Sequence, residues 1–145
     1  MFNITYRTHS EIQYLRDYKQ NKGSLVSTGA NEYGLAISEI QNKNKRIILL
    51  EKIVDEGKPK KKFKIVDTLN IDNLKENEFA LFGECERGEI PDRGIIAILK
   101  GNINDEDLES FTNVQKAWKV NIKTEKIELL TDLNGIECAN SAYGI

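Results

Sequence analysis

The sequence predicts an α+β fold: a single globular domain over residues 1–145, with a mainly antiparallel mixed sheet of about seven to nine strands and two short helices. Apolar and polar residues alternate with the two-residue period of strands through much of the chain. Residues 94–99 form an uncharged apolar run, and two segments carry helix-capping signals. A length of 145 residues, of which 39% are hydrophobic and 30% charged, fits one domain with a proper core.

Residues 79–101 are expected to form the centre of the sheet as two strands joined by a loop. The strand 94–100 is apolar on both faces, which is typical of a strand covered on both sides. The strand 79–86 begins apolar and ends acidic, so its start is expected to be buried and its end to face water. The connection 87–93 is long for a tight hairpin, and long connections are more often functional. An ordinary exposed loop is the simpler interpretation.

The N-terminal part is expected to hold a strand over residues 2–6 and then the first helix. A helix over residues 10–22 is predicted from Ser10 as the N-cap and Gln13 as its capping-box partner. Residues 24–33 are interpreted as a loop. The helix would bury three residues at helical spacing and end at a glycine in the left-handed conformation: Ile12, Leu15, Tyr18 and Gly23.

Three apolar segments with short connections then predict an antiparallel meander, and three more segments predict the closing strands. The meander strands are expected at residues 34–40, 46–54 and 63–71, and the closing strands at 118–122, 127–129 and 136–139.

A second helix is predicted over residues 104–113. Asn104 is a good N-cap, and the three acidic residues that follow it would oppose the positive end of the helix dipole. Leu108 and Phe111 would face inward. The acidic cluster of this segment therefore has a structural explanation that requires no ligand.

The two cysteines, Cys85 and Cys138, are predicted to be reduced and buried. A disulfide between them is expected only if the chain is exported. Zinc needs about four such ligands close in space. Because His9 is the one histidine in the sequence, no zinc site and no other metal or cofactor site is expected. The N-terminus lacks the pattern of a secretory signal, so the expected location is cytoplasmic.

The net charge of −2 conceals an uneven distribution of charge along the sequence. Residues 41–64 contain nine Lys and Arg against three Asp and Glu, a net charge of +6. Residues 65–109 contain four basic and twelve acidic residues, a net charge of −8. Such an asymmetry steers charged partners into particular orientations.

Familiar catalytic patterns are absent from the sequence. The glycine spacing of residues 83–89 resembles a phosphate-binding loop, but Glu89 stands where the motif needs lysine, and its acidic residues would repel phosphate. A Ser-His-Asp triad is not expected around His9. Glu84 and Glu86 would lie about 7 Å apart on one strand face, a separation that glycosidases use. Acids at this spacing are also common on solvent-facing strands, so the protein is not expected to be an enzyme.

The sequence therefore predicts a small protein-binding module. Immunity proteins and antitoxins are one class of this kind; they neutralise a basic toxin, such as a nuclease, by covering its active site, often with acidic groups. The predicted partner is a basic protein, and no membrane association is expected. The predicted partner-binding residues are Glu84, Glu86, Glu89, Asp92, Asp105 and Asp107.

Two alternatives remain open at this point. One is a nucleic-acid-associated protein in which a basic segment contacts phosphates; its residues would be Lys58, Lys60, Lys61, Lys62 and Lys64. A charged edge strand that discourages aggregation would explain the same lysines. The other alternative is a carboxylate-dependent hydrolase that uses Glu84 and Glu86.

Overall fold

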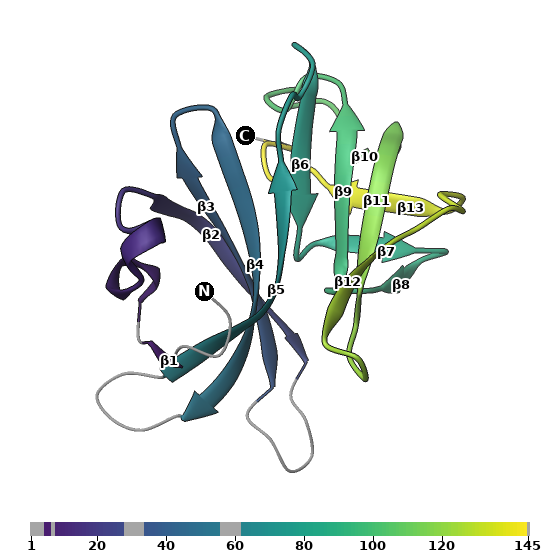
Figure 1. Cartoon of the computed structure of the whole chain (residues 1–145). Helices are drawn as coiled ribbons and strands as arrows, with labels where there is room; N and C mark the ends of the chain where they lie inside the picture. The colour runs from purple at the N-terminus through teal and green to yellow at the C-terminus, as the bar shows by residue number, and fades with distance from the viewer. Residues whose placement is uncertain (1–4, 7, 28–33, 56–61, 145) are drawn as a thin grey trace. The chain divides into compact units, whose positions relative to one another are not determined.

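The computed structural model describes residues 5–6, 8–27, 34–55 and 62–144 (Figure 1). Most of the described residues lie in strands or in the turns between them. The chain divides into two compact units, which we call the first unit (residues 1–72 and 121–127) and the second unit (residues 73–120 and 128–145).

The first unit contains an antiparallel sheet of five strands in the order β1-β5-β4-β3-β2. The predicted meander is confirmed, because β3, β4 and β5 pair in succession. The strands are β1 (Thr5–Tyr6), β2 (Lys19–Ser27), β3 (Leu35–Asn42), β4 (Lys45–Asp55) and β5 (Lys62–Ile71).

The predicted helix over residues 10–22 is wrong. The structure has two single-turn 3₁₀ helices instead, η1 (His9–Glu11) and η2 (Gln13–Leu15), and β2 begins at Lys19. Apolar residues spaced by three match the 3.0-residue turn of a 3₁₀ helix, and Ile12 adopts an extended backbone between the two turns. Ile12 and Leu15 are buried against the sheet. Part of the predicted loop 24–33 belongs to β2, and the rest lies outside the described residues.

A buried carboxylate ties the short strand β1 to the middle of this sheet. Tyr6 pairs with Phe63 of β5, and its hydroxyl donates a hydrogen bond to Glu51 of β4. The Ser38 hydroxyl donates to the other oxygen of the same carboxylate. Burial raises the pKa of Glu51 above its ordinary value, although the hydrogen bonds from Ser38 and Tyr6 and the charge of His9 oppose the rise.

The second unit contains two four-stranded sheets, in the orders β12-β11-β9-β6 and β10-β13-β7-β8, except for the last residue of β11 and the first two residues of β12, which belong to the first unit. Figure 1 shows β7 and β13 running across the direction of β9 and β11, an orthogonal arrangement of sheets. The strands are β6 (Glu78–Phe82), β7 (Cys85–Arg87), β8 (Ile90–Pro91), β9 (Ile95–Lys100), β10 (Ser110–Phe111), β11 (Val114–Asn121), β12 (Lys126–Leu129) and β13 (Ile136–Ala139).

The expected central pair is confirmed in part. β6 and β9 pair antiparallel, and β9 is an interior strand with Ile95, Ile96 and Ala97 buried. The prediction of one strand over residues 79–86 is wrong, because the chain bends at Gly83 and Glu84 and then enters the other sheet as β7. Gly83 has a φ of 89°, which glycine adopts at little cost. This change of sheet is one reason that the predicted single sheet of seven to nine strands, and with it the α+β class, is wrong.

The core of the second unit lies between its two sheets. Phe79, Leu99 and Ala117 contribute from one sheet, and Phe111 and Ile136 contribute from the other. The rings of Phe79 and Phe111 meet edge to face, with 4.8 Å between their centroids, a favourable arrangement for aromatic pairs.

Cys85 and Cys138 form a disulfide within this core. The predicted burial of both residues is confirmed, whereas the prediction of reduced thiols is wrong. Each cysteine lies on a short strand, β7 or β13, with its side chain buried. The two cysteines lie directly opposite each other on β7 and β13, a pairing that their separation of 53 residues in sequence does not reveal.

The predicted helix over residues 104–113 is also wrong, because this segment forms turns followed by β10. The side chains of Asn102 and Asp105 accept hydrogen bonds from backbone amides two residues further on, and such bonds compete with a helix. The side-chain amide of Asn140 donates to the carbonyl oxygens of Asp105 and Leu108, at 2.5 and 2.7 Å. Leu108, which was expected to face inward, is 41% exposed.

Among the described residues, no helix has the length and apolar character needed to cross a membrane.

We predict that Phe111→Ala lowers the free energy of unfolding by about 3–5 kcal/mol, because it opens a cavity between the two sheets and removes an aromatic pair. Chemical denaturation followed by circular dichroism measures the change. Phe111→Leu is the control that keeps most of the buried volume, so its loss should be clearly smaller. Equal losses in both variants would contradict a cavity effect.

Glu51 predicts an unusual dependence of stability on pH. Because the folded protein binds the Glu51 proton more tightly than the unfolded chain, this stabilisation is complete below the ordinary pKa of 4.5 and is lost as the pH rises through the folded pKa. Glu51→Gln should remove that loss, so the variant gains stability relative to the wild type as the pH rises from 4.5. Urea unfolding across this pH range measures the difference, and Glu76→Gln controls for the removal of one exposed charge. A constant difference between wild type and Glu51→Gln would contradict the prediction.

Candidate functional site

Four carboxylates surround a hollow of about 340 Å³ on the outer side of the β10-β13-β7-β8 sheet. We call it the acidic hollow. It is lined by Glu84, Glu86, Glu109, Ser110, Glu137 and Ala139.

The register of β7 against β13 brings two of these carboxylates together. Because Cys85 lies opposite Cys138, the next pair along the strands is Glu86 opposite Glu137. Neighbouring residues on a strand face opposite sides of the sheet, so the disulfide lies in the core and the two glutamates lie on the outside. The Ser110 hydroxyl on β10 approaches the Glu137 carboxylate at 3.4 Å.

The glutamate that faces Glu86 raises its pKa. A hydrogen bond with Glu137 is the largest cause that raises the pKa of Glu86, and partial burial and the negative charges of Glu137 and Glu89 raise it further. Like charges directly opposite each other on an antiparallel pair destabilise a sheet. The pair therefore opposes the folding of the sheet that holds it.

The charge of the acidic hollow is not balanced by the lysines and arginines of the described residues. In the part of the chain that the structure describes, no lysine or arginine forms an ion pair with its four carboxylates. The two units also differ in charge. The first unit has 15 Lys and Arg against 10 Asp and Glu, a net charge of +5, whereas the second unit has 6 against 13, a net charge of −7.

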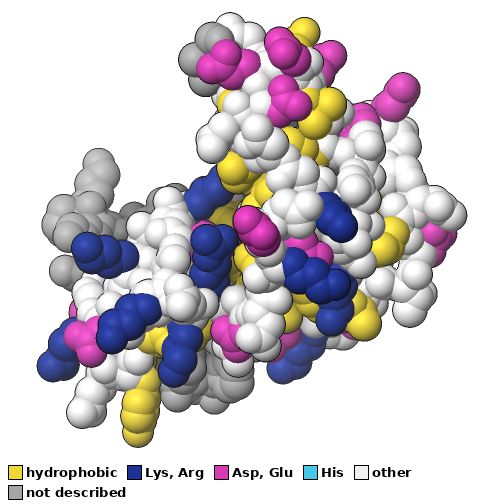
Figure 2. Space-filling model, turned by 90° about the horizontal axis from the view of Figure 1, so that it is seen from above, with side chains coloured by type: hydrophobic (Ala, Val, Ile, Leu, Met, Phe, Trp, Pro, Cys, Tyr) yellow, Lys and Arg dark blue, Asp and Glu magenta, His cyan; other side chains and the backbone are white. Residues whose placement is uncertain are grey.

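Acidic side chains also lie together on part of the molecular surface. On the face seen in Figure 2, one region carries several acidic side chains together with hydrophobic ones. Mixed acidic and apolar surfaces favour partners that present basic and apolar groups.

The structure brings together only some of the residues predicted to bind a partner. Glu84 and Glu86 line the acidic hollow, and Glu89 lies in the tight turn that follows β7. Asp92 has a structural role, because it forms an ion pair with Lys119 at 2.9 Å and accepts a hydrogen bond from the amide of Gly94.

The other two predicted residues lie in the turns between β9 and β10. The Asp105 carboxylate accepts a hydrogen bond from the amide of Asp107, so it stabilises the local turn. Asp107 is exposed. This segment ends at Glu109, which lines the acidic hollow.

Two residues of the hollow, Glu109 and Glu137, were not predicted. Glu137 lies between the buried residues Ile136 and Cys138, so the two-residue period of a strand indicates that it faces outward. The pairing of β13 with β7 was not predicted, because the two cysteines were expected to be reduced. A correct pairing of the cysteines would have located Glu137 next to Glu86.

The basic segment proposed for nucleic-acid binding is described only in part. Lys58, Lys60 and Lys61 lie outside the described residues. Lys62 and Lys64 lie on β5, where Lys64 is opposite Lys52 of β4 and Thr5 of β1. β5 is an interior strand of its sheet, so the described lysines do not form the charged edge strand that offered another explanation for this segment.

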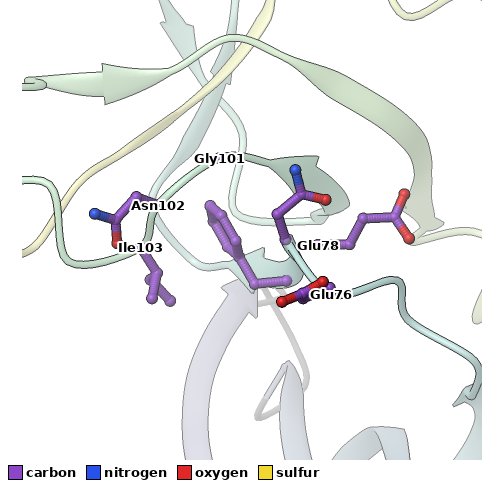
Figure 3. Close-up of a pocket in the computed structure, with 7 residues that line it drawn as sticks. Glu76, Glu78, Gly101, Asn102 and Ile103 are labelled. Atoms are coloured by element: carbon purple, nitrogen blue, oxygen red, sulfur yellow. The ribbon is translucent and has the colours of Figure 1, made fainter.

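A second hollow, of about 500 Å³, lies where β6 begins and β9 ends. Figure 3 shows Glu76 and Glu78 on the opposite side of it from Asn102 and Ile103. The carboxylate of Glu78 accepts a hydrogen bond from the amide of Lys75, which engages it in the local turn. The remaining lining residues are Asn77, Phe79 and Gly101.

The arrangement of carboxylates determines what the acidic hollow can do chemically. The described residues contain no group of three or more His, Cys, Asp and Glu arranged to hold a metal ion. Glu84 precedes β7 and is not part of a strand, so the expected carboxylate pair of one strand, Glu84 and Glu86, is replaced by the cross-strand pair Glu86 and Glu137. An open, negatively charged hollow is suited to bind cationic groups.

Comparison of the chain with protein-family models, with curated proteins and with solved structures found no match in any of the three.

We predict that Glu137→Gln lowers the pKa of Glu86, because it removes the largest cause of the raised value. A carbon-detected NMR titration of the Glu86 carboxyl group measures the midpoint. Glu89→Gln is the matched control: Glu89 contributes the smallest of the causes, so its removal should shift the midpoint less. A midpoint that is unchanged in Glu137→Gln, or that falls equally in both variants, would show that the two glutamates do not interact as described.

Proposed function

We propose that the protein is a binding protein whose acidic hollow covers a basic surface on a partner protein. The observation that carries the proposal is the facing pair Glu86 and Glu137, together with two further carboxylates that no described cation neutralises. This concentration of charge weakens the folded sheet but gives rapid and specific association with a complementary surface.

The specific form of the proposal is an inhibitor of the immunity-protein or antitoxin kind. A basic nuclease presents a cationic cleft that binds phosphates, and a cluster of carboxylates imitates the charge of its substrate. The net charge of −7 in the second unit supports a positively charged partner. Because disulfides rarely persist in the cytosol, we also propose that the protein meets its partner in an oxidising compartment and not in the cytoplasm.

One observation favours nucleic-acid binding as a second candidate. The first unit carries a net charge of +5, to which the basic segment of residues 58–64 contributes. Nucleic-acid affinity of this origin falls steeply as the salt concentration rises and requires the lysines.

The test of the proposed function uses two variants with the same change in net charge. Glu84→Lys with Glu109→Lys replaces two of the four carboxylates of the acidic hollow by cations and so cancels its formal charge, whereas Glu76→Lys with Glu106→Lys replaces two exposed carboxylates outside it. Association with a panel of purified small basic proteins, including nucleases, is measured at low and high salt. We expect the hollow variant to associate at least about tenfold more slowly at low salt, with a smaller difference at high salt.

The same titrations are made with labelled RNA and DNA, together with a variant in which Lys60, Lys61 and Lys62 are changed to Glu. Equal effects of the two acidic variants would show that only overall charge matters and would refute the hollow as the binding site. Tight binding of nucleic acid that is lost in the lysine variant and kept in the hollow variant would favour the second candidate.

A further inference from the structure

The disulfide and the facing glutamates occupy adjacent positions on the same two strands. Cys85 lies opposite Cys138, and Glu86 lies opposite Glu137 at the next position. The covalent bond therefore joins the two strands beside the point where their like charges repel each other.

The two strands are short, and beyond their ends the Gly88 amide donates to the Gly135 carbonyl oxygen and the Arg87 side chain donates to the Asn134 carbonyl oxygen. β7 has three residues and β13 has four, and their flanking strands β8 and β10 have two residues each. The Ala139 amide extends the pairing with a hydrogen bond of 2.9 Å to the Glu84 carbonyl oxygen. Short strands offer few hydrogen bonds to oppose the repulsion of two carboxylates.

We propose that the acidic hollow exists only while the Cys85–Cys138 bond is intact, so that oxidation of the two cysteines is the condition for binding a basic partner. Without the bond, β7 and β13 separate, and Glu84 and Glu86 move away from Glu109 and Glu137. This inference rests on the proposed function for its biological meaning, although the structural dependence can be tested without any partner.

The chemical step is a thiol–disulfide exchange with a dithiol reductant. The S–S bond breaks, each cysteine sulfur gains one electron and one proton, and the two sulfurs of the dithiol lose the same two electrons and two protons as they form their own disulfide. Both cysteines are buried, at 3% and 1% exposure, so the dithiol reaches the bond only when the strands open locally. The bond is therefore a structural disulfide that forms as the protein matures, and it is not reduced and reoxidised rapidly in the folded protein.

The experiment compares the wild-type chain before and after full reduction by a dithiol with the Cys85→Ala, Cys138→Ala variant, which does not respond to the reductant. Hydrogen exchange resolved by NMR follows two amides, one beside each edge of β7: Ala139 of β13, which donates to Glu84, and Asp92 after β8, which donates to Cys85. The Ala97 amide in β9 is the internal control.

We expect reduction to raise the exchange rates of the Ala139 and Asp92 amides at least tenfold, with a much smaller change at Ala97, and the melting temperature to fall by about 10 °C. The double variant should behave as the reduced protein does. Unchanged protection at Ala139 and Asp92 in a chain whose mass has risen by two hydrogens would overturn the proposal, as would a double variant with full protection.

Binding measurements test this inference separately from the proposed function. The basic protein that binds the oxidised wild type most tightly is titrated against the reduced chain and the double variant, and we expect at least a tenfold loss of affinity. Equal affinity in the oxidised and reduced forms would overturn the redox dependence while leaving the proposed function in place. If no basic protein of the panel binds the oxidised chain, the proposed function fails, and the exchange rates alone decide whether the hollow depends on the bond.

Discussion

The architecture of the second unit depends on the bond between Cys85 and Cys138. The chain leaves one sheet after β6, bends at Gly83 and begins a second sheet with β7. The disulfide fixes β7 against β13 at this point, and both sulfur atoms lie in the core between the sheets. By a chain-entropy estimate, a cross-link that closes about fifty residues contributes on the order of 4 kcal/mol. That contribution is large for strands of three and four residues, and it permits a charged outer face that hydrogen bonds alone would support poorly.

Several strands and the pairing of the meander could be predicted from the sequence, whereas β2, the 3₁₀ turns and the pairing of β7 with β13 could not. The meander of β3, β4 and β5 follows from the two-residue period of segments that also have short connections. The spacing of Ile12 and Leu15 fits an α-helix and a 3₁₀ helix equally well, and only packing against the sheet decides between them. Residues 104–113 satisfy the local rules for a helix, but the distant Asn140 takes the carbonyl groups that a helix would use.

In the candidate site too, local sequence patterns predict the character of single residues but not which distant segments pair. The acidic character of Glu84 and Glu86 is visible in the sequence, and so is the outward orientation of Glu137. Their proximity depends on the pairing of segments about fifty residues apart, which no local pattern specifies. Asp92 illustrates the opposite error: its charge suggested a partner, but Lys119 on a neighbouring strand already neutralises it.

The two units of this protein carry net charges of opposite sign. A sequence pI of about 5.6 describes the average of a unit at +5 and a unit at −7. This average does not show that the units differ in charge. In dilute buffer the Debye length reaches about 30 Å, so the acidic unit of one copy attracts the basic unit of another. Moderate salt should therefore screen this attraction, keep the molecules apart and improve their solubility.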